Sequence, residues 1–574
     1  MRFHALATDY DGTLATNGRV GDDVRAGLER LRSTGRKIIL VTGRRLDDLQ
    51  TVCPDLSIFD VVVAENGAVL YWPATRELRP LVEPPPPLFA ETLEKRGVPD
   101  VARGHVIVAT WQPHETVVLE VIRELGLEMQ VIFNKGAVMV LPSGVNKATG
   151  LRAALDALQL SPHNVVSVGD AENDHALLAA CACGVAVANA LPMLRERADL
   201  ITTGDHGAGV LEVAQRLIAN DLVEVTTPLA RHALPVGVDA AGTVISLPAY
   251  GANVLLAGTS GSGKSTFATA FLERLDERAY QYCVLDPEGD HGELPGATMV
   301  GSRLEKPPVD QMLKLLEKPG QSVVVNMLAV DLDQRPAFFA DLIPRLEFER
   351  SRFGHPHWVV LDEVHHLAPR GGATAPIATR HLVNLFMITV HPEHVSQALL
   401  SIIDVVVVVG TAPGETLGEI AAAVGVPAPR LATPALDQGE AVMWWPRQNR
   451  PPVSFRSTPP QTERRRHVRK YAEGELPPER SFYFRGPERK LNLRAQNLTS
   501  FLQLGEGVDD ETWLYHLRQG EYSRWLNTAI KDSELAAEVE AIERGRGHTA
   551  GAADARESRR AIKAAIERRY TAAG

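Results

Sequence analysis

The sequence predicts a multidomain α/β protein with a mainly helical C-terminal region. A single hydrophobic core usually stabilises a domain of up to about 250 to 300 residues, and this chain has 574. Short β-branched segments alternate with amphipathic helical segments up to about residue 220, and a second series of this kind starts at Asn253. Such alternation is typical of βαβ units on a parallel sheet, so we expect two separate α/β domains.

Composition and charge exclude several classes of protein. The chain is 45% hydrophobic and 23% charged, with a formal net charge of -11, so it is an ordinary, mildly acidic globular protein. Its four cysteines form no CxxC pair, which argues against a disulfide framework or a zinc knuckle. The sequence shows neither a signal-peptide pattern nor an apolar run of about 18 residues. We therefore expect a cytoplasmic protein without a membrane partner.

Interruptions of the α/β pattern predict the domain boundaries. A proline run at 84–87 opens an insertion of α+β type, and a segment rich in Pro, Ser, Thr and Arg follows the second series. The expected parts are a first α/β core at 1–82 and 144–222, its inserted cap at 83–143, a second α/β domain at 223–450, a linker at 451–470 and the mainly helical region at 471–574.

Four short motifs occur in a fixed order in the first domain. They are DYDGT with Asp9 and Asp11, VTGR with Thr42, VNK with Lys147, and GDAENDH with Asp170 and Asp174. Asp9 ends a strand, so the first two carboxylates emerge at the carboxyl edge of a parallel sheet, where ligands bind. Displacing a phosphate ester requires a nucleophile, a proton donor for the leaving oxygen and positive charge around the phosphoryl oxygens. One such motif is more often a solvated turn, but the ordered set indicates phosphoryl transfer.

This set resembles the motifs of the haloacid dehalogenase (HAD) superfamily phosphatases, and the resemblance implies a Rossmann-like core. By that resemblance Asp9 would be the nucleophile, forming an aspartyl-phosphate, and Asp11 would protonate the leaving group and then activate water. Thr42 and Lys147 would hold the transferring phosphoryl oxygens.

The resemblance also implies a Mg²⁺ cofactor. Its oxygen ligands would be Asp9, the backbone carbonyl of Asp11, and Asp170, with support from Asp174. ENGA at 65–68 and a cap between the second and third motifs resemble the sugar-phosphatase branch. The expected substrate is a phosphorylated small molecule such as a sugar phosphate, or a nucleic-acid end, and the candidates for contact with it are His105, Trp111 and Asn134.

A second constellation lies in the second domain. GTSGSGKST satisfies G-x-x-x-x-G-K-[ST] between the strand NVLLA and the helix TFATAFLERL, so it predicts an ATP-binding P-loop. Its phosphate-binding residues would be Gly258, Gly261, Gly263, Lys264, Ser265 and Thr266, with Ser265 on Mg²⁺. Asp362 and Glu363 follow the apolar strand HWVVL. Asp362 can hold the water shell of the metal and Glu363 can polarise an attacking water, which predicts an ATPase.

The strands and motifs around this P-loop resemble the HerA/FtsK class of ring-forming translocases over residues 233–415. They are LPVGVDAAGTVISL, YCVLDPEGDH and LDEVHH. The resemblance implies a homo-oligomer, of which a hexameric ring is one form. His391 stands where that class usually has a Gln that senses the γ-phosphate. An arginine from a neighbouring subunit would complete the site, and the candidates are Arg380, Arg345 and Arg350.

Three functions are compatible with these two sites. The first is a bifunctional enzyme, a Mg²⁺-dependent phosphohydrolase fused to an ATP-hydrolysing, motor-like domain. The second is a polynucleotide or small-molecule kinase joined to a phosphatase, although a water-activating Glu363 would waste ATP. The third is a phosphatase regulated by a nucleotide-binding scaffold that does not hydrolyse ATP. Basic segments such as Arg464–Arg466 keep nucleic acid open as a partner, and the sequence leaves open the substrate and any coupling between the sites.

Overall fold

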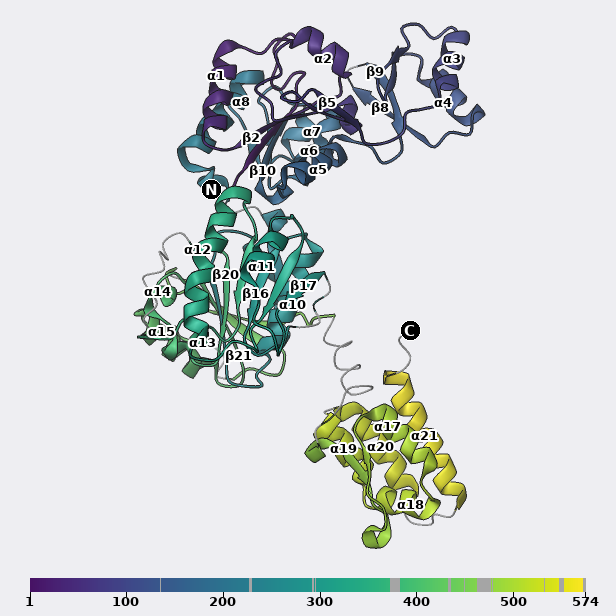
Figure 1. Cartoon of the computed structure of the whole chain (residues 1–574), viewed down its shortest axis with the longest axis vertical. Coiled ribbons are helices and arrows are strands. Elements are labelled where there is room, and N and C mark those ends of the chain that lie inside the picture. The colour runs from purple at the N-terminus through teal and green to yellow at the C-terminus, as the bar shows by residue number, and fades with distance from the viewer. Residues whose placement is uncertain are drawn as a thin grey trace. The chain divides into compact units, whose positions relative to one another are not determined.

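The computed structural model forms two compact units, Met1–Thr458 and Pro459–Gly574 (Figure 1). The residues that it describes are 1–134, 136–226, 230–291, 294, 296–371, 382–431, 435–448, 450–461, 476, 478–530, 532–546 and 552–570. No helix within these ranges is long and apolar enough to cross a membrane. The four cysteines are buried and carry free thiols.

An eight-stranded sheet in the order β12-β11-β10-β1-β2-β3-β4-β5 organises the N-terminal part. Its parallel strands are β1 (Ala5–Thr8), β2 (Lys37–Val41), β3 (Val61–Ala64), β10 (Val165–Gly169), β11 (Cys183–Ala186) and β12 (Leu200–Ile201). β4 (Val69–Trp72) and β5 (Glu77–Pro80) extend it in antiparallel fashion. The parallel strands are almost wholly apolar because both faces of the sheet are covered.

Alternate residues of each strand supply two cores. Leu6 of β1 packs in the cluster that includes Leu28 of α1 (Asp22–Ser33) and Val213 of α8 (His206–Asn220). Ala5 packs in the cluster that includes Leu151 of α5 (Lys147–Leu158). The other helices of this part are α2 (Leu46–Val52), α6 (His175–Ala180), α7 (Pro192–Arg195) and α9 (Val223–Thr226). The strand period of two thus places one side-chain set on each face.

A separate antiparallel sheet, in the order β6-β7-β9-β8, lies within the predicted cap. Its strands are β6 (Ala102–Arg103), β7 (Val108–Trp111), β8 (Met129–Asn134) and β9 (Ala137–Pro142), and its helices are α3 (Pro87–Lys95) and α4 (Glu115–Glu124). Val108 and Val140 pack with Phe89 of α3 and Val118 of α4. Met139 precedes Val140 on β9, so its side chain lies on the opposite face, and it packs in the core cluster of the first sheet. The cap sheet therefore presents one face to its own helices and the other to the α/β core.

The second large sheet has eleven strands in the order β14-β13-β23-β22-β21-β15-β20-β19-β16-β18-β17. Its parallel strands are β15 (Val254–Ala257), β16 (Tyr282–Asp286), β17 (Ala297–Val300), β18 (Ser322–Asn326), β19 (Trp358–Leu361), β20 (Leu385–Thr389) and β21 (Val405–Val409). The antiparallel strands are β13 (Leu234–Val238), β14 (Val244–Leu247), β22 (Glu440–Trp444) and β23 (Val453–Ser457). The helices are α10 (Lys264–Glu277), α11 (Val309–Leu316), α12 (Arg335–Phe353), α13 (Val364–Leu367), α14 (Gln397–Leu400) and α15 (Pro413–Val424).

One part of the predicted linker is a strand. Val453–Ser457 forms β23, which pairs with β22 and β13. Its central Phe455 is buried, while Arg456 is exposed, and this alternation suits a strand with one covered face. Residues 462–470 of the linker lie outside the described residues.

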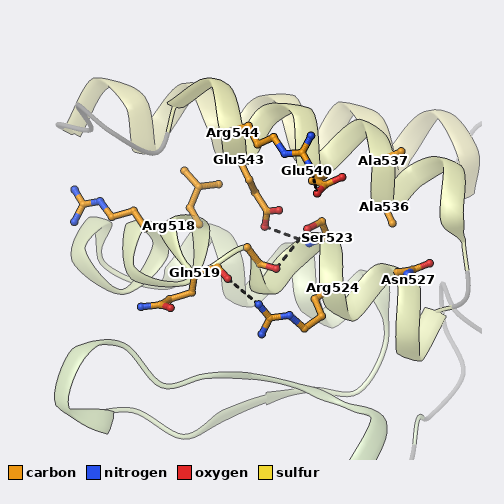
Figure 2. A pocket seen from close by; sticks show the side chains of 12 residues that line it. Arg518, Gln519, Ser523, Arg524, Asn527, Ala536, Ala537, Glu540, Glu543 and Arg544 are labelled. Carbon is orange, nitrogen blue, oxygen red and sulfur yellow. Dashed lines mark hydrogen bonds and ion pairs between the residues drawn. The ribbon is translucent and has the colours of Figure 1, made fainter.

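The second unit combines a short hairpin with five α-helices in its described residues. The hairpin consists of β24 (Phe482–Phe484) and β25 (Leu493–Ala495), and the helices are α17 (Leu498–Gly507), α18 (Asp510–Arg518), α19 (Glu521–Trp525), α20 (Ser533–Arg546) and α21 (Ala552–Tyr570). Their core includes Phe484, Phe501 and Trp513. A hollow of about 930 Å³ is lined by residues of α18, α19 and α20 (Figure 2). At its wall the buried Glu543 accepts hydrogen bonds from the backbone N–H groups of Tyr522 and Ser523.

Candidate functional sites

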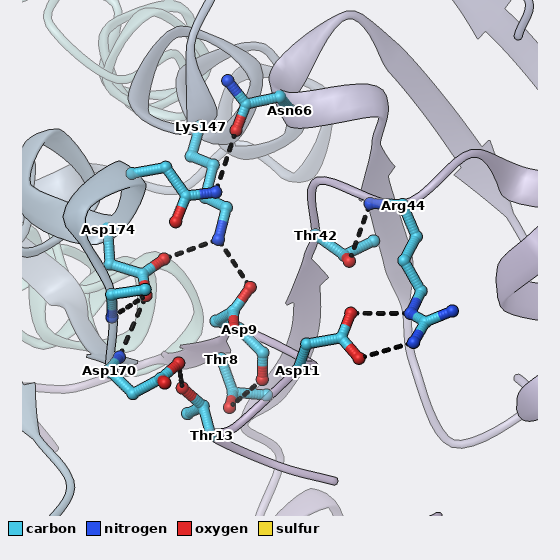
Figure 3. Close-up of polar contacts among 12 residues, drawn as sticks. Thr8, Asp9, Asp11, Thr13, Thr42, Arg44, Asn66, Lys147, Asp170 and Asp174 are labelled. Atoms are coloured by element: carbon cyan, nitrogen blue, oxygen red, sulfur yellow. Dashed lines mark hydrogen bonds and ion pairs between the residues drawn. The ribbon is translucent and has the colours of Figure 1, made fainter. Parts of the chain in front are cut away.

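Three buried carboxylates meet at the carboxyl edge of the first sheet (Figure 3). Asp9 follows β1 and Asp170 follows the adjacent β10, and Asp174 lies one turn beyond Asp170. Ligand oxygens of the three side chains all lie within 4.8 Å of one another. The backbone N–H groups of Asp170 and Ala171 donate to Asp174 Oδ2, at 2.9 and 3.0 Å, which fixes that carboxylate. The sheet topology thus brings together the first and last of the four motifs.

Lys147 supplies the positive charge of this cluster. Its Nζ lies 2.5 Å from Asp9 Oδ1 and 2.6 Å from Asp174 Oδ1, and its side chain is 1% exposed. Lys147 is the first residue of α5, and Asn146 caps that helix through a capping box. Gly67 of the ENGA turn has a φ of +105°, and a Cβ there would lie 2.0 Å from the carbonyl oxygen of Asn146. A glycine at this position lets the turn pack closely against the helix start that aims Lys147.

The electrostatics of the cluster favour a divalent cation. Burial, then the charge of Asp174, raises the pKa of Asp9 to about 7, against the opposing effect of Lys147. Burial also opposes the charge of Lys147, yet Asp174 and Asp9 together raise its pKa above the ordinary value. The single positive charge of Lys147 does not neutralise three buried carboxylates. Carboxylate oxygens at this spacing fit Mg²⁺, which prefers hard oxygen ligands, and Asp170 is also tied to the DYDGT motif by a hydrogen bond from Thr13 Oγ1 of 2.9 Å.

Asp11 is held by an arginine that the motif analysis did not assign. Arg44 Nε and Nη2 donate to the two carboxylate oxygens of Asp11, at 2.6 and 2.7 Å (Figure 3). Asp11 in turn raises the pKa of Arg44 above its ordinary value through this hydrogen bond. The backbone N–H of Arg44 donates to Thr42 Oγ1 at 3.1 Å, and Thr42 is fully buried. Arg44 is the last residue of VTGR, two positions after Thr42, and this proximity in sequence was the signal that could have identified it as a site residue.

A hollow of about 480 Å³ opens next to these residues. It is lined by Asp9, Asp11, Gly43, Arg44, Arg45 and Asp48 of the core and by Asp100, Ala102, Ile107, Ala109, Thr110, Trp111, Ala137 and Met139 of the cap. Trp111, a predicted contact residue, is therefore part of its wall. His105 instead donates its backbone N–H to Glu65, and the side chain of Asn134 lies outside the described residues.

Glu65 anchors the cap to the core. Its buried carboxylate accepts the backbone N–H groups of His105, Val106 and Ile107 at 2.8, 2.7 and 2.8 Å. Bonds to an ionised acceptor are among the stronger hydrogen bonds in proteins. Glu65 belongs to the ENGA segment that sequence reasoning linked only to a subfamily, and its role follows from the tertiary contact.

The predicted P-loop connects β15 to α10. Gly258, Gly261 and Gly263 have φ values of 159°, 75° and 101°, conformations that glycine adopts without strain. Lys264 is the first residue of α10, and its Nζ donates to the carbonyl of Thr259 at 3.0 Å. Ser265 and Thr266 follow it on the same helix. Burial lowers the pKa of Lys264, although Glu363 and Asp362 oppose that shift.

Asp362 and Glu363 follow β19, two strands from β15 in the same sheet. Asp362 Oδ2 lies 3.3 Å from Nε2 of His291, the last residue of the YCVLDPEGDH segment, to which the sequence analysis gave no role. Glu363 Oε2 is buried and accepts no hydrogen bond from the described residues, while His365 Nδ1 lies 3.3 Å away. Burial, then Asp362, raises the pKa of Glu363 to about 7. A carboxyl group with such a pKa suits proton transfer near neutral pH.

The remaining predicted residues of this site are spread over the second domain. His391 follows β20, and its side chain is 52% exposed beside Glu393. The guanidinium of Arg350 donates hydrogen bonds to the carbonyls of Pro356, His357 and Val383, so this candidate is held within its own domain. Arg345 pairs with Asp310 on the surface, and Arg380 lies outside the described residues.

The chain is similar to known phosphatases over its first part. The family described as haloacid dehalogenase-like hydrolase matches residues 6–79 and 105–213. A phosphoglycolate phosphatase from Methanothermobacter thermautotrophicus is 30% identical over 223 residues, which are 37% of this chain and 98% of the relative. Another, from Haloarcula marismortui, is 33% identical over 215 residues, covering 36% and 94%. A solved haloacid dehalogenase-like hydrolase from Bacteroides thetaiotaomicron is 19% identical, with a TM-score of 0.33, and covers 38% of this chain and 99% of its own.

The parallel sheet with its acidic cluster and buried lysine defines a hydrolase domain of the phosphatase type. Through residues 6–213 the chain belongs to the haloacid dehalogenase-like hydrolase family, and the predicted resemblance to that superfamily is confirmed.

Proposed function

We propose that this chain is a bifunctional enzyme in which the phosphatase acts through an aspartyl-phosphate on Asp9, and the second domain hydrolyses ATP as part of a homo-oligomer. The observation that carries the first activity is Lys147, buried between Asp9 and Asp174 at 2.5 and 2.6 Å. The carboxylate of Asp9, as the proposed nucleophile, and the cation of Lys147 lie at one sheet edge, and the hollow lined by core and cap residues offers a way in for a phosphate.

The residues divide the chemistry as follows. An oxygen of Asp9 attacks phosphorus while the bond to the leaving oxygen breaks, and Lys147 and Thr42 stabilise the charge on the phosphoryl oxygens. Asp11 donates the proton that the leaving oxygen needs, then accepts one from the water that hydrolyses the aspartyl-phosphate. Mg²⁺ held by Asp9 and Asp170 would neutralise the approaching phosphate. Asp11 can serve in this way only after its carboxylate leaves Arg44.

The substrate that we propose is a small phosphate monoester with a second anionic group, with phosphoglycolate as the first candidate. Arg44 and Arg45 both line the hollow of about 480 Å³, which suits a small molecule. A guanidinium matches a carboxylate in bidentate geometry. The names of the relatives from Methanothermobacter thermautotrophicus and Haloarcula marismortui support the same choice. Sugar phosphates and phosphorylated nucleic-acid ends remain the competing substrates.

A phosphatase screen with Mg²⁺ tests this proposal. We expect phosphate release from phosphoglycolate at a higher kcat/KM than from sugar phosphates or 3′-phosphorylated DNA, and no release by Asp9→Asn. A preference for sugar phosphates would reject the substrate but keep the mechanism. Full activity of Asp9→Asn would reject the mechanism.

The ATPase activity is supported by the arrangement around Glu363. Its carboxyl group is 14% exposed and has a pKa raised to about 7. Glu363 directly follows Asp362 at the end of β19, in the sheet that also carries the P-loop. A base for water is thus available, which favours hydrolysis over transfer of phosphate to a bound hydroxyl. The resemblance to HerA/FtsK translocases supports an oligomeric, motor-like role, with nucleic acid as a candidate cargo.

Incubation with γ-labelled ATP, with and without 5′-hydroxyl DNA, separates the three functions. We expect the wild type to release free labelled phosphate and Glu363→Gln to release none. Labelled DNA would establish the kinase alternative. Nucleotide binding without turnover, together with an altered phosphatase rate, would establish the scaffold alternative.

A further inference from the structure

Two imidazoles and one carboxylate form a cluster on the loop after β20, beside the candidate ATPase site. Ligand atoms of His391, Glu393 and His394 all lie within 4.8 Å of one another. His391 Nδ1 is 3.2 Å from Glu393 Oε1, and His394 Nε2 is 3.7 Å from the same oxygen. A tetrahedral ion with bonds of about 2.0–2.1 Å holds its ligand atoms roughly 3.3 Å apart. The spacing of the three side chains therefore matches the ligand set of a transition-metal ion.

The local backbone explains why these side chains converge. Pro392–His394 form a 3-10 helix, in which residues three apart lie above one another, so His391 and His394 share one side. The N–H of His394 donates to the carbonyl of His391 at 3.1 Å, and the N–H of His391 donates to Thr389 Oγ1 at 3.0 Å. The N–H of Arg370 donates to the carbonyl of His394 at 2.7 Å. Both ends of the segment are thus tied to neighbouring elements before any ion binds.

We propose that His391, Glu393 and His394 bind a zinc ion, with water in the remaining coordination position. Two imidazole nitrogens and one carboxylate oxygen are donors that zinc accepts and that Mg²⁺ does not favour. Side chains of His391, Glu393 and His394 are 52, 44 and 64% exposed, which leaves an entry path for the ion. The site is distinct in chemistry from the all-carboxylate cluster of Asp9, Asp170 and Asp174.

The zinc site is linked to Glu363 by a short series of contacts. Thr389 Oγ1, which accepts from the backbone of His391, lies 3.0 Å from His365 Nδ1, and that nitrogen lies 3.3 Å from Glu363 Oε2. An ion on His391 Nδ1 would also occupy the side chain that sequence analysis assigned to γ-phosphate sensing. The link to ATP hydrolysis rests on the proposed function, whereas zinc binding does not.

Equilibrium dialysis of the full chain against zinc at buffered free concentrations, with excess Mg²⁺, tests the proposal. Excess Mg²⁺ fills the hard carboxylate sites, so retained zinc reports sites with nitrogen ligands. We expect the wild-type chain to retain one more zinc ion than each of the variants His391→Gln, Glu393→Gln and His394→Gln. At this site, each variant should bind zinc at least tenfold more weakly than the wild type does. The matched control His114→Gln, on a part-exposed cap histidine, should bind as the wild type does.

Equal zinc retention by the wild type and all three variants would overturn the proposal, as would a wild-type chain that retains none. In either case His391, Glu393 and His394 form only a surface ion-pair cluster. Thermal unfolding of each variant in EDTA checks its fold, because these exposed side chains should shift the unfolding temperature little when no metal is present.

Discussion

The guanidinium of Arg44 holds the carboxylate of Asp11 through two hydrogen bonds, of 2.6 and 2.7 Å, at the mouth of the phosphatase site. Asp11 is the residue proposed to protonate the leaving group, and Arg44 also lines the hollow where a substrate would lie. A second anion on the substrate would compete for the same guanidinium. In the proposed mechanism, binding of such a substrate to Arg44 would therefore displace Asp11 from it and free the Asp11 carboxylate for proton transfer.

Arg44→Ala should impair substrates with a second anion selectively. Loss of a charge-assisted hydrogen bond costs about 1.5–3 kcal/mol, so kcat/KM for phosphoglycolate should fall roughly 10- to 100-fold. Phenyl phosphate, which has no second anion, should lose much less. Steady-state kinetics on both substrates measures the difference, with Arg76→Ala, on an exposed turn, as the control. Equal losses on both substrates would show that Arg44 acts only by positioning Asp11.

Asp9→Asn should abolish the phosphatase and leave ATP hydrolysis unchanged. Removing a nucleophile costs about 10⁴-fold or more in kcat, because no other group takes its place. Phosphate release from phosphoglycolate and from ATP, measured on the same preparation, gives both rates. Asp23→Asn, on the exposed first turn of α1, is the matched control. Loss of both activities in Asp9→Asn would mean that the sites are not independent.

Lys264→Ala should give the reciprocal result. Its Nζ is the cation of the predicted P-loop, and without it the outer phosphates of ATP lose their main positive partner. ATP hydrolysis should fall at least 100-fold while phosphoglycolate hydrolysis stays within twofold of the wild type. The exposed Lys318→Ala serves as control. Undiminished ATP hydrolysis by Lys264→Ala would remove the P-loop assignment.

The Met1–Thr458 unit should lose stability in mild acid. Burial lowers the pKa of His4, His163, His232 and His355 to about 4 in each case, below their ordinary value of 6.5. At these four histidines the unfolded chain therefore binds more protons than the folded chain between these values. Asp9 and Glu363, with pKa values raised to about 7, act in the opposite direction but are fewer, so stability falls as pH drops from about 6.5 toward 4. Thermal unfolding at pH 7 and pH 5, without metal, measures the change.

His163 offers a variant for that experiment. Its ring stacks on Tyr280 with centroids 3.7 Å apart, and its Nε2 lies 2.8 Å from the carbonyl of Arg278. His163→Gln keeps a polar group there but removes one proton-binding site, so the difference in unfolding temperature between pH 7 and pH 5 should shrink. His114→Gln in the cap should not alter it. An unfolding temperature of the wild type that is unchanged between the two pH values would contradict the prediction.

The order of motifs was enough to predict the family, and it named residues that lie together in the structure. Asp9, Lys147, Asp170 and Asp174 are named by their motifs, and the structure brings the three carboxylates within 4.8 Å of one another. Arg44 and Glu65 lay inside quoted motifs without an assigned role. Their partners, Asp11 and the backbone of 105–107, are distant in sequence, and no local pattern reports a contact of that kind.

Composition misplaced one boundary of the predicted linker. Val453–Ser457 lies among prolines and arginines that favour a linker, yet Phe455 is buried in the second core. Pairing with β22 and β13 gives its backbone hydrogen bonds that the segment could not make alone.

The sequence by itself determined the two α/β series that form the two large sheets, the phosphatase family and the residue types available for phosphoryl transfer, because these depend on local periodicity and on motifs of fixed spacing. Tertiary structure decided which charges meet: Lys147 with Asp9, Arg44 with Asp11, and Glu65 with the cap. The strength of an ion pair depends on distance and burial, and both are set only when strands far apart in the chain lie side by side.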